Sequence, residues 1–500
     1  MRILPFILAA ATASVSLAEA APTPERYSNP IPLPDYPVGV RARDLVRGEP
    51  AEPEGLWLLD RKEQFRELAD PSALWHEGKW YLYPSVRMAW VSDDEGRTWR
   101  HAPLNVPDIG YAPSIVHHAG RFLLIASESE LYSGPTPLGP FEKLGPLQIP
   151  KVPGIPGQGD PMLFSDDDGR LFYYWGCTPR SGIWCVELDS ANPTRAIGEP
   201  REMIPFAPDT FPWERLGNWN QDPNLGWMEG GWMVKHGGRY YLTYSAGGTQ
   251  WRTYAMGCYV SDSPLGPFTP QKRNPMFRTT DGLITGSAHG CIVAGPRDSL
   301  WAFYTVFAGV AHGFERRVGM DIAAIDEHGE LYVPAATSMP QALPSATASV
   351  APAWLPLNDG DFTIGSSNAP NLSGRFAVDN SLLTWWQPAA DDAQPTLTTR
   401  FSNRAAIHAV RVIWRDVGLD TPKGVVPGPV RYRVEAETAR GVWTTIIDRS
   451  TSEEDFLIDY RECMPTSATR ARLVIVGQPA GITPAVAEFT VFGITERAGQ

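Results

Sequence analysis

The chain has 500 residues, of which 43% are hydrophobic and 20% charged, so it is long enough for two or three folded domains. Its net charge of −13 argues against nucleic acid or an anionic membrane as a partner. The many aromatic residues, glycines and prolines (18 Trp, 46 Gly and 48 Pro) predict short strands joined by many turns. A neutral sugar is a partner compatible with this composition.

The first segment in chain order, residues 1–20, reads MRILPFILAAATASVSLAEA. Arg2 is followed by an apolar run and by the small-residue pattern AEA, which is typical of a secretory signal peptide. A buried first strand is the alternative interpretation. No later apolar run reaches the length of a membrane span. We therefore expect a periplasmic or secreted protein with no membrane anchor, whose residues 21–54 form an N-terminal extension.

A block of two aromatic strands joined by a tight turn recurs five times between residues 55 and 340. The copies read DPSALWHEGKWYLYPS from Asp70, APSIVHHAGRFLLIAS from Ala112, DPMLFSDDDGRLFYYWG from Asp160, EGGWMVKHGGRYYLTYS from Glu229 and HGCIVAGPRDSLWAFYT from His289. The turns are irregularly spaced, at about the length of one four-stranded sheet. This spacing predicts the blades of a β-propeller with variable loops.

The first residue of each block occupies one register of the repeat, counted back from the turn. The innermost strand of a propeller blade lines the central channel, so residues at this register converge on one axis. Asp70, Asp160, Glu229 and His289 would meet there. Three crowded carboxylates shift one another's pKa values and can divide the acid and base roles of glycoside hydrolysis. By contrast, we expect the run 166–168, DDD, to form the turn of the third block and not a metal site.

These blocks, together with SPLGPF at residues 263–268, resemble glycoside hydrolase family 43 over roughly residues 55–340. The resemblance implies a five-bladed propeller that inverts the anomeric carbon by direct displacement. It implies that Asp70 is the general base, that Glu229 is the general acid, and that Asp160 positions this acid and modulates its pKa. His289 matches a histidine often near a central metal or water, and we include it among the substrate-binding residues. We expect no required cofactor and assign no metal ligands.

Further substrate-binding candidates lie near the blocks. An indole packs well against the C–H face of a sugar, and packing in the blade core is the alternative for each tryptophan. These candidates are Trp75, Trp219, Trp227 and Trp251. Arg317, in the pair Arg316-Arg317, is a candidate to bind sugar hydroxyls, with a surface salt bridge as the alternative.

After a Pro/Ala/Ser-rich linker over residues 341–356, short alternating strands over 357–495 predict a β-sandwich. The motif AVDNSLLTWWQP resembles discoidin-like domains, also called family 32 carbohydrate-binding modules, which implies a jelly-roll sandwich. Asp379 and Asn380 fall where such domains often hold a structural calcium ion, and a simple turn is the alternative. Cys177 and Cys185 could pair across a hairpin or remain free thiols.

We therefore expect an all-β protein, a five-bladed β-propeller followed by a discoidin-like sandwich. The expected function is a secreted, exo-acting, inverting glycosidase whose substrate is an oligo- or polysaccharide. Family members act on arabinofuranosides, xylosides or galactosides, and the sequence does not choose among them. The alternative is a carbohydrate-binding propeller protein that lacks catalysis.

Overall fold

The computed structural model describes residues 26–35 and 66–496, apart from positions 86–87, 107–109, 128, 156, 311–312, 344–351 and 359–361. The signal peptide predicted over residues 1–20 lies outside the described residues, as do most of the N-terminal extension and half of the linker. Within these described ranges, no helix has the length and apolar character needed to cross a membrane.

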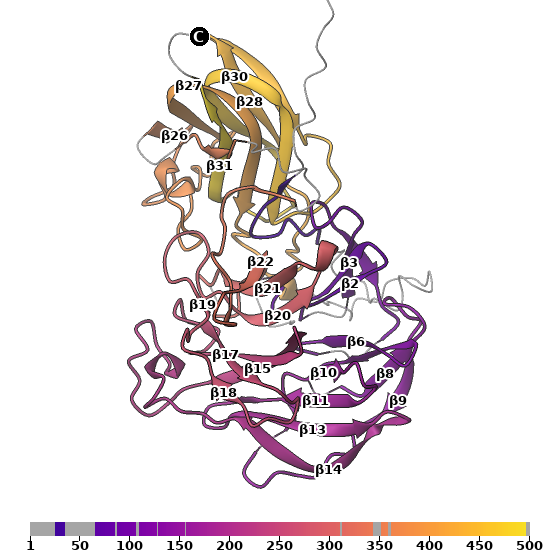
Figure 1. Ribbon diagram of the computed structural model, residues 1–500. Helices are drawn as coiled ribbons and strands as arrows, with labels where there is room; N and C mark the ends of the chain where they lie inside the picture. Colours follow the sequence, from indigo (N-terminus) through magenta and orange to yellow (C-terminus); the bar gives the residue numbers. More distant parts are fainter. Residues whose placement is uncertain are drawn as a thin grey trace, which may run out of the picture.

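Five antiparallel sheets form the blades of the propeller (Figure 1). The first contains β2 (Ser72–His76), β3 (Lys79–Tyr83), β4 (Met88–Ser92) and β5 (Arg100–Pro103); the second contains β6 (Ser114–His118), β7 (Arg121–Ile125), β8 (Leu131–Gly134) and β9 (Glu142–Gly145). The third contains β10 (Met162–Ser165), β11 (Leu171–Trp175), β13 (Ile183–Asp189) and β14 (Asn192–Ile204).

The fourth blade contains β15 (Met228–His236), β16 (Arg239–Ala246), β17 (Ala255–Ser261) and β18 (Thr269–Pro270), with β12 (Cys177–Thr178) on β15 and β19 (Phe277–Arg278) on β17. The fifth contains β20 (Ala288–Ala294), β21 (Leu300–Phe307), β22 (Arg316–Ile325) and β23 (Leu331–Tyr332). The first strands of the blades touch in the order β2, β6, β10, β15, β20, and β20 returns to β2. The five-bladed propeller predicted from the repeat is thereby confirmed.

Aromatic side chains fill the core between the blades. Trp80 and Trp301 are fully buried, and the ring of Trp80 lies 5.0 Å from that of Phe303. Strands that alternate large aromatic and small residues bury large apolar areas against neighbouring blades. The aromatic composition therefore serves the blade core first.

The C-terminal part of the chain forms a second β body above the propeller (Figure 1). Its sheet runs β25 (Leu355–Pro356), β31 (Val486–Thr495), β27 (Thr396–Trp414), β30 (Ile458–Gly477), β28 (Arg431–Ala439) and β29 (Val442–Asp448), with β26 (Thr363–Gly365) on β27. Register shifts interrupt the long β27–β30 pairing, where β-bulges bend strands around a separate core that includes Trp386 and Phe489. This is the predicted β-sandwich.

The N-terminal segment and an ion cluster join the two bodies. Strand β1 (Arg26–Tyr27) pairs with β24 (Gln341–Ala342). The buried guanidinium of Arg66 lies 2.7 Å from Asp35, 2.7 Å from Asp416 and 2.6 Å from Asp455. Because Asp416 and Asp455 belong to the C-terminal body, this arginine fixes the sandwich against the propeller. Short 3₁₀ turns complete the fold: η1 (Pro212–Glu214), η2 (Pro296–Asp298), η4 (Gly374–Ala377) and η5 (Thr421–Lys423).

Candidate active site

A shared backbone device sets the register of the repeat. Asp70, Ala112, Asp160 and His289 all have left-handed backbones, with φ of 48°, 49°, 51° and 36°. The N–H of each donates to a hydroxyl near the end of the second strand of the preceding blade; the acceptors are, in the same order, Thr305, Ser85, Ser127 and Ser245, at 2.8–3.0 Å. Thr305, which accepts the N–H of Asp70, belongs to the fifth blade. This hydrogen bond therefore joins the fifth blade to the first and closes the ring.

The fourth blade departs from the pattern by one residue. Gly230, and not Glu229, has the left-handed conformation there, with φ of 60°. A Cβ on Gly230 would lie only 2.6 Å from Cδ2 of His289, so the close approach of the imidazole requires glycine. Glu229 precedes this glycine, at a β-bulge in the β15–β16 pairing, and its side chain reaches the axis from there.

His289 lies at the centre of the three carboxylates. Its Nδ1 is 3.2 Å from Oδ1 of Asp70, 3.9 Å from Oδ2 of Asp160 and 3.8 Å from Oε1 of Glu229, and all four residues are buried. Burial disfavours the imidazolium, but the negative charges of Asp70 and Asp160, with Glu229, outweigh it and raise the pKa of His289 to about 9. The imidazole of His289 is therefore protonated, and its positive charge lies close to all three carboxylates.

Asp70 is held by donors on both of its oxygens. Arg316 donates from Nη1 to Oδ1 over 2.8 Å, and the hydroxyl of Ser85 donates to Oδ2 over 2.8 Å. Arg316 is itself buried, and it also donates to Glu67 and Thr249. This fixed carboxylate can accept a proton from a water molecule without first reorganising.

Glu229 is held by a different set of donors. The indole Nε1 of Trp227 donates to Oε2 over 2.6 Å, the hydroxyl of Tyr254 donates to Oε1, and the thiol of Cys177 lies 3.4 Å from Oε2. Burial alone would raise the pKa of Glu229, but the hydrogen bond and charge of His289, with Tyr254, lower it to about 2. All five cysteines are free thiols, so Cys177 and Cys185 are not paired.

Asp160 has the opposite balance. Burial raises its pKa to about 7; His289 opposes this shift, while the charges of Glu229 and Asp70 add to it. Of the two, Asp160 is therefore the carboxyl that keeps its proton to the higher pH. The role of general acid that the resemblance implies for Glu229 would place this proton on Glu229 instead. The difference arises because the imidazolium of His289 and the donors around Glu229 stabilise the negative charge there.

The other predicted residues lie in different surroundings. Trp227 contacts the carboxylate of Glu229 through its N–H. Trp219 is 78% exposed, beside Arg252. Trp251 is partly buried, and Trp75 packs against Trp80 with ring centroids 5.0 Å apart, as blade packing would require.

Arg317 does not join the carboxylate cluster. Neighbouring side chains of a strand point to opposite faces, so Arg316 faces Asp70 while Arg317 lies 3.5 Å from Asp35. The sequence predicts Arg317 of this pair as the substrate-binding residue, and the repeat does not reveal which face of β22 is turned toward the channel. Tyr254 and Cys177 lie outside the repeated register, so the repeat does not predict their contacts with Glu229.

One residue in the predicted turn of the third block, Asp166, makes contacts with the neighbouring blade. Asp166 is buried and accepts hydrogen bonds from Lys235 (2.5 Å) and Tyr240 (2.6 Å), linking the third blade to the fourth. Burial opposes ionisation, but Lys235 and Tyr240 lower the pKa of Asp166. Asp167 and Asp168 form the turn itself.

Two groups of residues bear on metal binding. Asp160, Glu229 and His289 offer ligand atoms that lie within 4.8 Å of one another. A cation there would have to displace the proton of His289, whose pKa of about 9 favours the imidazolium. In the sandwich, the carboxylate of Asp379 accepts hydrogen bonds from the hydroxyl of Thr384 at 2.8 and 2.9 Å. The calcium ion expected at Asp379 and Asn380 stays a prediction.

The chain is similar to several known proteins. Residues 88–330 match the model of glycosyl hydrolases family 43. A beta-xylosidase of Xylanibacter ruminicola is 26% identical over 261 residues, which cover 41% of this chain and 78% of the relative. A beta-D-galactofuranosidase of Aspergillus niger is 28% identical over 265 residues, with coverages of 45% and 69%. A solved glycoside hydrolase structure shares the fold, with a TM-score of 0.50 at 18% identity, covering 87% of this chain and 98% of that one.

A five-bladed propeller with three buried carboxylates around its axis, together with these matches, defines an inverting glycoside hydrolase. Over residues 88–330, the propeller of this chain is thus similar to the glycosyl hydrolases of family 43.

Proposed function

We propose that the protein is an exported, exo-acting glycosidase that removes arabinofuranosyl, xylosyl or galactosyl residues from plant or similar polysaccharides. The observation that carries this proposal is the contact of one imidazole, that of His289, with the carboxylates of Asp70, Asp160 and Glu229. Relatives named beta-xylosidase and beta-D-galactofuranosidase support the sugar classes, and the apolar run in residues 1–20 supports export.

In this proposal Asp70 is the general base. An inverting glycosidase needs one carboxylate that takes a proton from water while the oxygen of that water attacks the anomeric carbon. Arg316 and Ser85 hold the two oxygens of Asp70, so its orientation is set before substrate binds. The proton of the water passes to Asp70 as the new C–O bond forms.

Glu229 is the general acid, and Asp160 is the residue that keeps a proton in the cluster. Near neutral pH the proton lies on Asp160, whose pKa is about 7, within the same group of contacts around His289. Transfer of this proton to Glu229 arms the acid, which then protonates the leaving oxygen as the glycosidic bond breaks. The N–H of Trp227 and the hydroxyl of Tyr254 stabilise the carboxylate that remains.

A panel of nitrophenyl glycosides tests the proposal. Nitrophenyl α-L-arabinofuranoside, β-D-xyloside, β-D-galactoside and β-D-galactofuranoside would be incubated with the wild type and with Asp70→Asn. We expect hydrolysis of at least one by the wild type and loss of that hydrolysis in the variant. A different outcome is that the folded wild type hydrolyses neither these glycosides nor arabinoxylan or arabinan. If it is nevertheless retarded in an affinity gel that contains one of these polysaccharides, the non-catalytic binding function is favoured.

A further inference from the structure

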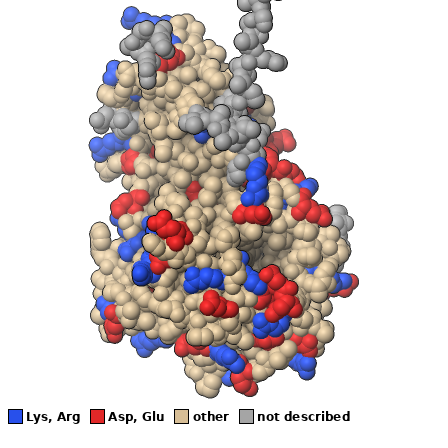
Figure 2. Space-filling model, viewed as in Figure 1, with Lys and Arg blue, Asp and Glu red and all other residues tan. Residues whose placement is uncertain are grey.

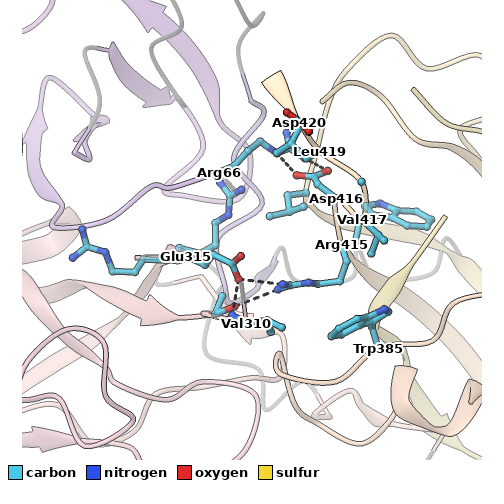
Figure 3. A pocket seen from close by; sticks show the side chains of 15 residues that line it. Arg66, Val310, Glu315, Trp385, Arg415, Asp416, Val417, Leu419 and Asp420 are labelled. Atoms are coloured by element: carbon cyan, nitrogen blue, oxygen red, sulfur yellow. Dashed lines mark hydrogen bonds and ion pairs between the residues drawn. The ribbon is translucent and has the colours of Figure 1, made fainter. Parts of the chain in front are cut away.

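A second pocket lies where the propeller meets the sandwich (Figure 3). It has a volume of about 340 Å³, which falls in the range of small-molecule sites. The propeller contributes Val310 and Glu315 from the loop between β21 and β22, and the sandwich contributes Trp385 and Arg415. Figure 3 shows side chains of both bodies turned toward this space. Neither body forms the pocket alone.

The topology places this pocket beside the catalytic carboxylates. Strand β21 runs antiparallel to β20, and Thr305 near its end pairs with Ala288, directly before His289. The loop after β21 therefore lies at the end of the blade that carries the catalytic cluster. Arg316, the first residue after this loop, lines the pocket and also donates to Asp70 over 2.8 Å. One side chain thus belongs to both sites.

Exposed aromatic rings flank this shared arginine. Tyr111 is 48% exposed and Phe314 is 39% exposed, and the guanidinium carbon of Arg316 lies 6.0 Å and 5.1 Å from their ring centroids. The hydroxyl of Tyr111 also donates to Glu67, which Arg316 contacts. Aromatic surface therefore surrounds the arginine that connects Asp70 to the pocket.

The pocket lining suits a polyhydroxylated ligand. Trp385 is partly buried, whereas its neighbour Trp386 is fully buried in the sandwich core, so only Trp385 offers its indole outward. Arg415 lies 5.6 Å from the ring of Trp385 and donates to Glu315 over 3.1 Å. An indole face binds the C–H groups of a sugar, and paired guanidinium and carboxylate groups bind hydroxyls without selecting for net charge.

We infer that this pocket is a distal subsite of the active site, which binds sugar residues of the same polysaccharide chain whose terminal bond is hydrolysed. The inference rests on the proposed function, and it assigns the C-terminal sandwich a direct share in substrate selection. An enzyme with such a subsite gains catalytic efficiency as the substrate lengthens, because the added residues contact Trp385 and Arg415.

The test is the dependence of kcat/KM on chain length. The probes are xylo-oligosaccharides of two to six residues, or 1,5-linked arabino-oligosaccharides if the arabinofuranoside is the glycoside hydrolysed. For each variant, kcat/KM of the longest probe is divided by kcat/KM of the disaccharide. A loss of activity that affects all substrates equally cancels in this ratio. We expect this ratio to exceed one in the wild type and to fall about tenfold in Trp385→Ala, with partial recovery in Trp385→Phe.

Trp443→Ala is the matched control. This tryptophan also lies in the sandwich and also packs against an arginine, Arg472, at 4.3 Å, but it is not among the residues that line this pocket. The ratio should not change in it. Should Trp385→Ala fail to fold, Trp385→Leu keeps the apolar bulk and removes the aromatic face.

Two failures can be told apart. If the wild type hydrolyses a nitrophenyl glycoside but its ratio equals that of folded Trp385→Ala or Trp385→Leu, the distal subsite is refuted and the proposed function stands. If the wild type hydrolyses no glycoside, the proposed function fails, and the subsite fails with it.

Discussion

Arg316 donates a hydrogen bond of 2.8 Å to Oδ1 of Asp70, and both side chains are buried. Nδ1 of His289, from the same blade as Arg316, lies 3.2 Å from the same oxygen. Two cationic groups therefore converge on one carboxylate oxygen. Since Ser85 occupies the second oxygen, the orientation of Asp70 is fixed by its neighbours and not by substrate.

The first prediction concerns this base. Asp70→Asn removes the proton acceptor while it keeps the shape of the side chain, so kcat should fall by about 10² to 10⁴. Steady-state kinetics on the preferred nitrophenyl glycoside measure the loss. Asp167→Asn is the control, because Asp167 is exposed at a turn. This variant should hydrolyse the glycoside at the wild-type rate. Wild-type kcat in Asp70→Asn would contradict the assignment.

The second prediction concerns Glu229 as the acid. Glu229→Gln can no longer protonate the leaving oxygen, and the need for this proton is greatest when the leaving group is a poor one. We expect a small loss of kcat/KM on dinitrophenyl glycosides and a much larger loss on unactivated oligosaccharides. An equal loss on both kinds of substrate would show that Glu229 has some other role.

The third prediction concerns the proton on Asp160. With a pKa of about 7, Asp160 loses this proton as the pH rises through neutrality, whereas His289 and Tyr254 hold the pKa of Glu229 well below its ordinary value. Asp160→Asn leaves only Glu229 to carry the proton of the acid. The alkaline limb of the pH–rate profile should therefore move to lower pH, and kcat should fall.

The control for this profile is again Asp167→Asn, which changes a neighbouring carboxylate outside the channel. Its alkaline limb should stay where it lies in the wild type. If the limb moved in Asp167→Asn but not in Asp160→Asn, the proton would have been assigned to the wrong group.

The fourth prediction concerns stability and His289. The pKa of this imidazole in the folded protein, about 9, lies above its ordinary value of 6.5. Its stabilising contribution is thus fully present below pH 6.5 and is lost as the pH rises through 9, a change on the order of 3 kcal/mol. Thermal unfolding should show a steeper fall of Tm between these pH values in the wild type than in His289→Gln. Parallel curves would exclude a protonated His289.

The fifth prediction concerns the ion cluster between the bodies. Arg66→Ala leaves the buried carboxylate of Asp35 and the partly buried carboxylates of Asp416 and Asp455 without this partner, which should cost about 3–5 kcal/mol of unfolding free energy. Chemical denaturation measures this cost. Arg170→Ala removes a largely exposed ion pair with Asp168 and should change stability by less than about 1 kcal/mol. If the two variants lost similar amounts of unfolding free energy, Arg66 would not be the residue that fixes the sandwich against the propeller.

The repeat allowed the propeller and the meeting of Asp70, Asp160 and His289 to be predicted, because one register of a cyclic repeat must face one axis. A further signal lay in the same blocks. Four of the five blocks end in serine or threonine, and these hydroxyls accept hydrogen bonds from the backbone N–H groups of the register residues. Reading those positions would have revealed how each blade fixes the next.

Other features depend on which face of a strand points inward, and the sequence does not encode this locally. Arg316 and Arg317 are chemically identical neighbours, and only the register of β22 against β21 decides which one reaches Asp70. The protonation of Asp160 likewise depends on burial and on donors that Tyr254 and Trp227 supply to Glu229. No spacing in the sequence reports those contacts.

The most direct test of the catalytic account is proton NMR of the first sugar released from the preferred glycoside, recorded before mutarotation. Water activated by Asp70 attacks from the face opposite the oxygen that Glu229 protonates, so the account predicts a product of inverted anomeric configuration. Asp70→Asn should release this sugar only at its residual rate. A first product of retained configuration would mean that a carboxylate acts as the nucleophile, and it would contradict the assignment of Asp70 as the base.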